Sequence, residues 1–204
     1  MVEKNEKRKY VPNTETYKKT LTSLIEHDQD TTLMCVRMGC EMGMTRIEIV
    51  NARVSDMDRY NKRGLWIKVA KAVRRGKKRM EDGTLKPKFE MRSREVPVNP
   101  ELYQLIKSYA DEDQVFILKR KKGKIDIPFA PRYINTLYEK ANIPWSSHKS
   151  RHFFKSQIWA WMRENRQVDP GLVKDLMGHK KTVTEIYGSI SWDYKCGVVD
   201  KVFG

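Results

Sequence analysis

The sequence is poor in cysteine and has no long apolar run. Its three cysteines, Cys35, Cys40 and Cys196, form no Cys-x-x-Cys pair, so we expect neither a disulfide framework nor a cysteine zinc site. No stretch approaches the ~18 apolar residues that a membrane helix requires. The polar first nine residues contain no apolar segment of a secretory signal. These absences predict a soluble protein of the reducing cytoplasm with no membrane partner.

Motifs for nucleotide cofactors and metals are also missing. The chain has no P-loop and no Gly-x-Gly-x-x-Gly segment. His148 and His152 are four positions apart on a predicted helix, a spacing that can place two metal ligands on one face. However, no glutamate lies between them, and the charges of Lys149 and Arg151 oppose a metal ion. We therefore expect neither a metal site nor any other cofactor.

Positive charge, in contrast, is in large excess. Lysine and arginine total 41 against 26 acidic residues, which gives a net charge of +15. Basic and acidic residues are equal in number in residues 1–30. Residues 59–94, in contrast, carry fourteen bases and three acids, and the run 119–124 carries bases and no acid. A single such run can be a solvated surface, but two indicate a polyanionic partner. Because neither run lies on a predicted amphipathic helix, we favour a nucleic acid over an anionic membrane.

Contacts of these basic segments with a nucleic-acid backbone, such as that of double-stranded DNA, would position a duplex without reading its sequence. The residues that we expect to make such contacts are Arg74, Arg75, Lys77, Lys78, Lys86, Lys121 and Lys122.

Local patterns predict a mostly helical α+β fold with a small antiparallel sheet or hairpin on one side. Residues typical of helix N-caps precede several apolar-periodic segments. The strand-like segments 64–70 and 94–98 flank residues 74–88, which we expect to form a long basic loop or the tip of a hairpin. The expected helix starts are Asn13, Asn99-Pro100, Ser146 and Asp169-Pro170.

One group of residues has the composition of a phosphate site. His148 and Arg151 are three positions apart at the start of a predicted helix, so their side chains are neighbours. Helix N-termini favour anions, and arginine can donate to two phosphate oxygens. Tyr187 follows downstream, and a phenol can attack phosphorus if its proton is removed and cations hold the developing charge.

Four segments in this order resemble the signature of the tyrosine recombinases, also called phage-type integrases. The resemblance extends over about residues 30–190. The segments are Glu41 to Asp58, similar to the first arginine box; Lys88 to Val98, similar to the hairpin that carries the family's lysine; His148-x-x-Arg151; and Leu176-Met177-Gly178-His179 followed by Tyr187.

The resemblance implies a metal-free phosphoryl transfer in which a tyrosine forms a 3′-phosphotyrosine with DNA and releases a 5′-hydroxyl. Tyr187 would be the nucleophile, with Tyr194 in reserve. The other implied roles are phosphate binding by Arg46 and Arg151, protonation of the leaving oxygen by Lys88, general acid/base or orienting action by His148, and a phosphate hydrogen bond from His179.

Two positions of the signature are ambiguous. A gapless match places Thr45, not Arg46, at the family's first arginine. We expect Arg46 to take the role of the family's first arginine, because Thr45 would then cap the following helix. Lys88 fits the position of the family's lysine best, and Lys86 is the second choice.

The resemblance implies a site-specific DNA recombinase, or integrase, of a viral or mobile element. The alternatives are a catalytically impaired DNA-binding or regulatory module and a type IB topoisomerase-like nicking and closing enzyme. The expected assembly is a homotetramer on DNA that is monomeric or weakly associated without it. The expected location is the cytoplasm of the host cell, at the nucleoid.

The expected domain organisation is an N-terminal extension with a short helix, residues 1–30, followed by a recombinase catalytic domain, residues 31–204. The separate DNA-clamping, or core-binding, domain of complete family members is expected to be absent. The apolar tail 198–203 is expected either to dock on a neighbouring subunit or to fold back on its own core.

Overall fold

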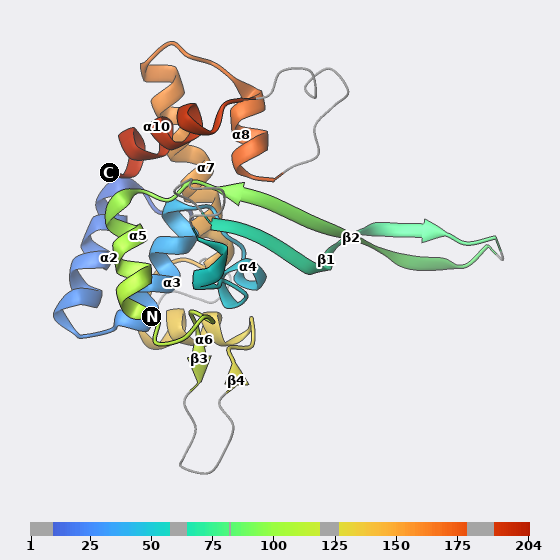
Figure 1. Ribbon diagram of the computed structural model, residues 1–204, viewed down its shortest axis with the longest axis horizontal. Helices are drawn as coiled ribbons and strands as arrows, with labels where there is room; N and C mark the ends of the chain where they lie inside the picture. The colour runs from blue at the N-terminus through green and yellow to red at the C-terminus, as the bar shows by residue number, and fades with distance from the viewer. Residues whose placement is uncertain (1–9, 58–64, 82, 119–126, 179–189) are drawn as a thin grey trace.

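The computed structural model describes residues 10–57, 65–81, 83–118, 127–178 and 190–204 (Figure 1). For most strand residues it describes the backbone alone. The elements are α2 (Thr14–Glu26), α3 (Asp30–Glu41), α4 (Arg46–Val50), the short 3₁₀ helix η1 (Val54–Asp56), β1 (Leu65–Arg79), β2 (Leu85–Val96), α5 (Pro100–Tyr109), β3 (Ile117–Leu118), β4 (Ile127–Pro128), α6 (Tyr133–Lys140), α7 (Ser147–Glu164), α8 (Pro170–Leu176) and α10 (Trp192–Phe203).

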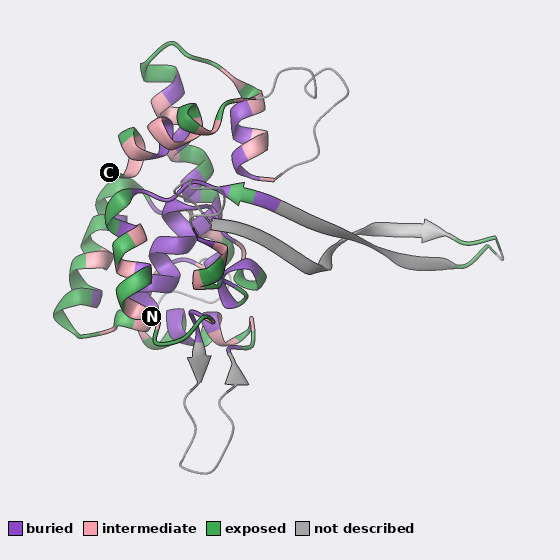
Figure 2. Cartoon of the chain, in the orientation of Figure 1, coloured by how far each residue is buried: buried purple, intermediate pink, exposed green. Residues whose placement is uncertain are grey.

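Helix α3 is the centre of the helical body. All its residues from Thr32 to Glu41 are buried, and α2, α5, α6 and α7 pack around it (Figure 2). Tyr17 and Leu24 of α2 belong to the same hydrophobic core. Helix α7 extends from this core into a second one that it shares with α8 and α10. These features confirm the mostly helical fold predicted from the sequence.

The predicted helix starts are confirmed, and their caps explain them. The side chains of Asn13 and Asn99 accept hydrogen bonds from backbone N–H groups of the first turns of α2 and α5. Asp169 does the same for α8, and Pro follows the cap in α5 and α8. Ser146 occupies the N-cap position of α7 without a side-chain bond to the helix.

Strands β1 and β2 form an antiparallel hairpin that projects from the helical body (Figure 1). Pairing runs from Leu65 opposite Val96 to Arg79 opposite Leu85, with two register shifts on the way. Of the two expectations for 74–88, the long basic loop was wrong and the hairpin was right, but the strands extend farther than expected, because β1 continues to Arg79 and β2 begins at Leu85. Polarity alone indicated a loop, but a two-stranded ribbon has faces that tolerate charged residues.

The C-terminal tail folds back on its own chain in this structure. Val198 and Val199 of α10 are buried in the second core. The ring of Phe203 stacks on Phe154 of α7, with centroids 5.5 Å apart. Of the two expectations for this tail, the structure therefore shows the one in which it packs in cis.

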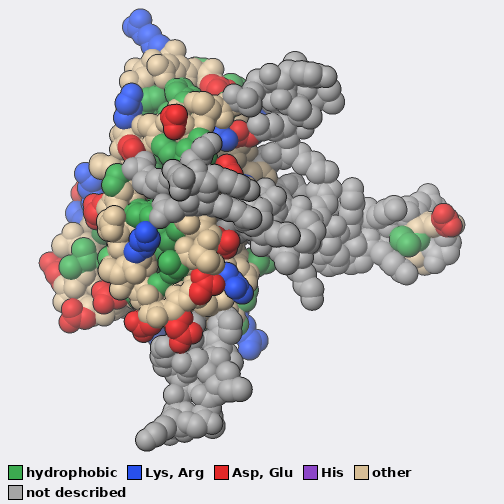
Figure 3. All heavy atoms as spheres, in the orientation of Figure 1, with side chains coloured by type: hydrophobic (Ala, Val, Ile, Leu, Met, Phe, Trp, Pro, Cys, Tyr) green, Lys and Arg blue, Asp and Glu red, His purple; other side chains and the backbone are tan. Residues whose placement is uncertain are grey.

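Charges of both signs are interspersed over the helical body on the face shown in Figure 3. The described helices include none with the length and apolar character needed to cross a bilayer.

Asn99 joins α5 to α3, and its replacement should destabilise the fold. It is fully buried, its Oδ1 accepts from the N–H of Leu102, and its Nδ2 donates to Glu41 Oε2 at 2.6 Å. We predict that Asn99→Ala lowers the free energy of unfolding by about 2 kcal/mol in urea titrations. The control Asn165→Ala, which removes an exposed bond to a helix carbonyl, should cost under ~0.5 kcal/mol. Equal losses would contradict the account.

Candidate functional site

The site is built around the turn that joins α3 to α4. Gly43 has φ +61°, and a Cβ there would lie 2.5 Å from the ring of Phe154 in α7. Only glycine fits this conformation and this close approach without strain. The turn therefore lies directly against α7, the helix that carries His148 and Arg151.

Thr45 caps α4, as expected from the sequence. Its N–H donates to Glu48 Oε2 at 2.7 Å, and its hydroxyl accepts from the Glu48 N–H at 3.4 Å, which is a capping box. Arg46 is the first residue of the helix, and its side chain is exposed.

The carboxylate of Glu48 is held by an arginine from the end of β2. Arg94 donates from Nε to Glu48 Oε1 at 2.8 Å and from Nη2 to Glu48 Oε2 at 3.0 Å. Each side chain is only 4% exposed. Arg94 Nη2 also donates to the carbonyl of Gly43 at 3.0 Å, and Nη1 donates to the carbonyl of Leu176. One guanidinium thus connects α4, the glycine turn, the hairpin and the end of α8.

Arg151 lies beside this pair. Its Nη1 donates to the Gly43 carbonyl at 2.5 Å and lies 3.6 Å from Glu48 Oε2, and its Nη2 donates to the Met177 carbonyl. We call Glu48, Arg94 and Arg151 the arginine cluster. It is buried and contains two positive charges and one negative charge, so it carries a net charge of +1.

The turn after α8 rests on the arginine cluster. Gly178 has φ +61°, and a Cβ there would collide with the side-chain stem of Arg94. A side chain at position 178 is therefore excluded both by the backbone conformation and by Arg94. His179 comes next in the sequence and lies outside the described residues, as does Tyr187.

The cluster fixes the protonation of its members. Burial alone would raise the pKa of Glu48, but the charge and hydrogen bonds of Arg94, with the Thr45 N–H, outweigh it and lower that pKa to about 2. Burial, and then the charge of Arg94, lowers the pKa of Arg151 to about 10. The Glu48 carboxylate and the Arg151 guanidinium are therefore ionised at neutral pH.

His148 is at the first turn of α7, on the exposed side of the helix. Partial burial lowers its pKa below the ordinary value, and the charges of Lys149, Arg151 and Arg46 lower it further. The imidazole is therefore neutral at pH 7. Arg46 contributes its charge from α4. Three predicted residues, Arg46, His148 and Arg151, are therefore brought near one another by α4 and α7.

The other predicted residues are not brought to this place by the described structure. Lys88 lies in β2, six positions before Arg94, which is on the order of 20 Å along a strand. Tyr194, the reserve nucleophile, is exposed in α10, where its hydroxyl donates to Gln167 at 3.4 Å. Of the predicted DNA contacts, Arg74, Arg75, Lys77, Lys78 and Lys86 belong to the hairpin strands, whereas Lys121 and Lys122 lie outside the described residues.

Glu48 and Arg94 lie within the two motif segments 41–58 and 88–98, but no role was predicted for either residue from the sequence. A signal was present for both, because Arg94 lies two positions before Val96, near the apolar end of the predicted strand, and Glu48 completes a capping box with Thr45. A charged residue next to buried apolar positions needs a partner. Within the described residues, no three metal-ligating side chains come together.

Residues 14–191 match the family model described as the phage integrase family. The chain therefore belongs to that family, which confirms the resemblance to tyrosine recombinases. A comparison with curated protein sequences gives no match.

Solved structures share the fold at low identity. The integrase from mycobacterium phage Brujita has 15% identity and a TM-score of 0.57 over 85% of this chain and 52% of its own. XerA recombinase has 18% identity and a TM-score of 0.54 over 96% of this chain and 65% of its own. The Tn1549 transposon integrase, in complex with transposon right-end DNA, has 15% identity and a TM-score of 0.54 over 96% of this chain and 67% of its own. The chain thus spans about half to two thirds of the length of these proteins.

Breaking the Glu48–Arg94 pair should destabilise the whole domain. Arg94→Met leaves a buried carboxylate with one less partner, so we predict a loss of about 3–5 kcal/mol in the free energy of unfolding by urea. The double variant Arg94→Met/Glu48→Met should lose less than the sum of the single variants. The control Arg53→Met, which breaks an exposed pair with Asp113, should cost under ~1 kcal/mol. Additive losses from the two buried residues would contradict a coupled pair.

The same pair makes stability depend on acid pH. A carboxyl whose pKa falls from ~4.3 in the unfolded chain to about 2 in the fold contributes stability above pH ~4.3, and this stability is lost as the pH falls through 2. We predict that Glu48 contributes about 3 kcal/mol to this loss. Urea titrations over this pH range should show a flatter profile for Glu48→Gln, and parallel profiles would rule out this origin.

Proposed function

We propose that the chain is the catalytic part of a site-specific DNA recombinase that cleaves and rejoins DNA through a 3′-phosphotyrosine on Tyr187. The observation that carries the proposal is the arginine cluster, with its net positive charge, at the start of the helix that also presents His148. Membership of the phage integrase family supports the reaction type. The Tn1549 integrase, which shares the fold, was solved in complex with transposon DNA.

The chemistry requires cations where negative charge develops on phosphorus. Arg151 is oriented by two carbonyls, from Gly43 and Met177, which use two of the five N–H groups of its guanidinium. In this proposal the remaining donors bind non-bridging phosphate oxygens. Arg46 adds a second charge from the start of α4, where its exposed side chain is accessible to DNA.

His148 acts as the general acid/base of this site, since it is neutral at pH 7 and faces solvent. His179, which follows Gly178 in the sequence, binds the phosphate in this proposal. Lys88 donates to the leaving 5′-oxygen, and its distance along β2 means that the hairpin must lie against the DNA when it does so. The basic residues of β1 and β2 then contact the DNA backbone.

The assembly on DNA is proposed to be a homotetramer that is weakly associated or monomeric without DNA. Residues 31–204 are proposed as the catalytic unit. The proposed location is the nucleoid of the host cell.

One observation favours the alternative of a catalytically impaired DNA-binding module. In the gapless match Thr45 stands at the family's first arginine position, and its side chain is engaged as a helix cap. Arg46 must then supply the charge. A type IB topoisomerase-like activity would use the same residues, and it would act as a monomer without strand exchange.

The experiment is covalent trapping on a nicked suicide DNA substrate that carries an attachment site, with EDTA present. We predict a covalent protein–DNA adduct that Tyr187→Phe abolishes and Tyr194→Phe leaves intact. Arg46→Ala should slow adduct formation roughly a hundredfold, because it removes a charge that stabilises the transition state. The matched control Arg53→Ala, on an exposed arginine paired with Asp113, should not slow it.

Two results would contradict parts of this proposal. Tight binding to the site without any adduct would favour the impaired module. An adduct that Arg46→Ala leaves unchanged would mean that Arg46 does not replace the family's first arginine.

A further inference from the structure

His148 has a second imidazole in hydrogen-bond contact. The Nε2 atoms of His148 and His152 lie 3.2 Å apart, one helical turn from each other on α7. Their rings are nearly perpendicular, at 80°, with centroids 4.8 Å apart. At this distance one Nε2 must carry a proton and the other must accept it, since two N–H groups or two lone pairs would repel. The two imidazoles are therefore of opposite tautomer.

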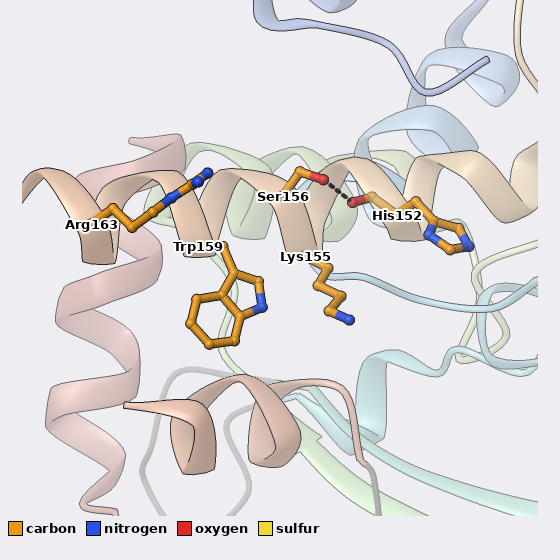
Figure 4. A pocket seen from close by; sticks show the side chains of 5 residues that line it. All are labelled: His152, Lys155, Ser156, Trp159 and Arg163. Carbon is orange, nitrogen blue, oxygen red and sulfur yellow. Dashed lines mark hydrogen bonds between the residues drawn. The ribbon is translucent and has the colours of Figure 1, made fainter. Parts of the chain in front are cut away.

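His152 also borders an open groove along α7. Figure 4 shows the groove residues along one side of this helix, with His152 at one end. The groove encloses about 400 Å³, and its other lining residues are Lys155, Ser156, Trp159 and Arg163. His152 itself is exposed. With Nε2 engaged by His148, the second nitrogen of His152, Nδ1, is the one that can exchange protons with the solvent of the groove.

We propose that His148 and His152 form a proton-relay pair, in which His152 passes protons between His148 and the solvent of the α7 groove. The proposal rests on the proposed function, because it assigns His148 to the cleavage step. It makes His152 a positioning and relay residue that acts through His148.

The relay needs no group beyond the two imidazoles and water. His148 starts with its proton on Nε2 and a lone pair on Nδ1, and His152 starts with its proton on Nδ1. When His148 Nδ1 takes the phenol proton, its Nε2 proton moves to His152 Nε2, and the Nδ1 proton of His152 passes to water. Both imidazoles end neutral with exchanged tautomers, and the reverse sequence returns a proton for religation.

The surrounding charges keep the pair neutral, as a relay of this kind requires. The charges of Lys149 and Arg151, from α7 itself, and of Arg46, from α4, act on His148. For His152, partial burial lowers the pKa first, followed by the charges of His148, Lys149, Lys155 and Arg151. A second proton on the pair is therefore opposed from all these positions.

The pair can be tested in the free protein by NMR titration of the imidazole signals. We predict the Nε2–H tautomer for His148 and the Nδ1–H tautomer for His152 at neutral pH, and a rise in the pKa of His152 in His148→Gln. His27, which hydrogen-bonds the Ser23 carbonyl of its own helix, is the internal reference and should not shift. Like tautomers, or an unchanged pKa of His152, would overturn the pair.

The relay is tested by single-turnover cleavage of the suicide substrate. We predict that His152→Ala slows cleavage about tenfold to a hundredfold at unchanged DNA affinity. Added imidazole should restore much of the rate, because it can occupy the vacated position and carry protons. His152→Gln should be equally slow without rescue, since an amide keeps a hydrogen bond but cannot relay. His27→Gln is the matched control and should cleave at the wild-type rate.

The outcomes separate the relay from simpler roles. A His152→Gln variant as fast as wild type would overturn the relay and leave only a hydrogen bond that orients His148. A slow His152→Ala variant that imidazole does not rescue would overturn it as well. If the wild-type protein binds DNA but forms no adduct, the proposed function and the relay both fail, while the NMR titration still decides whether the pair exists.

Discussion

The bidentate contact between Arg94 and Glu48 is the interaction on which the rest of the site depends. Glu48 is the only carboxylate of the arginine cluster, and it also completes the capping box that starts α4. Arg94 uses its other donors to hold the Gly43 turn and the end of α8. Three segments far apart in the sequence, the Gly43 turn with α4, the end of β2 and the end of α8, therefore meet at one ion pair. Such a buried pair costs much desolvation, which many hydrogen bonds must offset.

The functional consequence is an unequal charge balance. One carboxylate faces two guanidinium groups, so the buried cluster keeps one positive charge in excess. The bidentate contact with Glu48 offsets the charge of Arg94. Arg151 lies farther from Glu48, at 3.6 Å, so more of its positive charge is available to a ligand. In the proposed function this excess is directed at a DNA phosphate, beside a histidine that partial burial and the charges of Lys149, Arg151 and Arg46 keep neutral.

Much of the fold could be predicted from sequence because it depends on local rules. Asn13, Asn99 and Asp169 cap the helices that they were expected to cap, and Thr45 does the same at the site. The hairpin length was not predicted, since strand pairing is a long-range property and residues 74–88 are polar. The roles of Arg94 and Glu48 were missed for the same reason, because 46 positions separate the partners. His179 and Tyr187 remain predictions from the family signature.

The most direct test of the account is whether Arg151 stabilises charge on the phosphate, which can be measured with two suicide substrates. One carries the normal phosphate at the cleaved position and the other a methylphosphonate, which lacks one non-bridging charge. We predict that Arg151→Ala loses far more cleavage rate on the phosphate than on the methylphosphonate, because the methylphosphonate has less charge for Arg151 to stabilise. Equal losses on both substrates would contradict it and would leave Arg151 with a purely structural role.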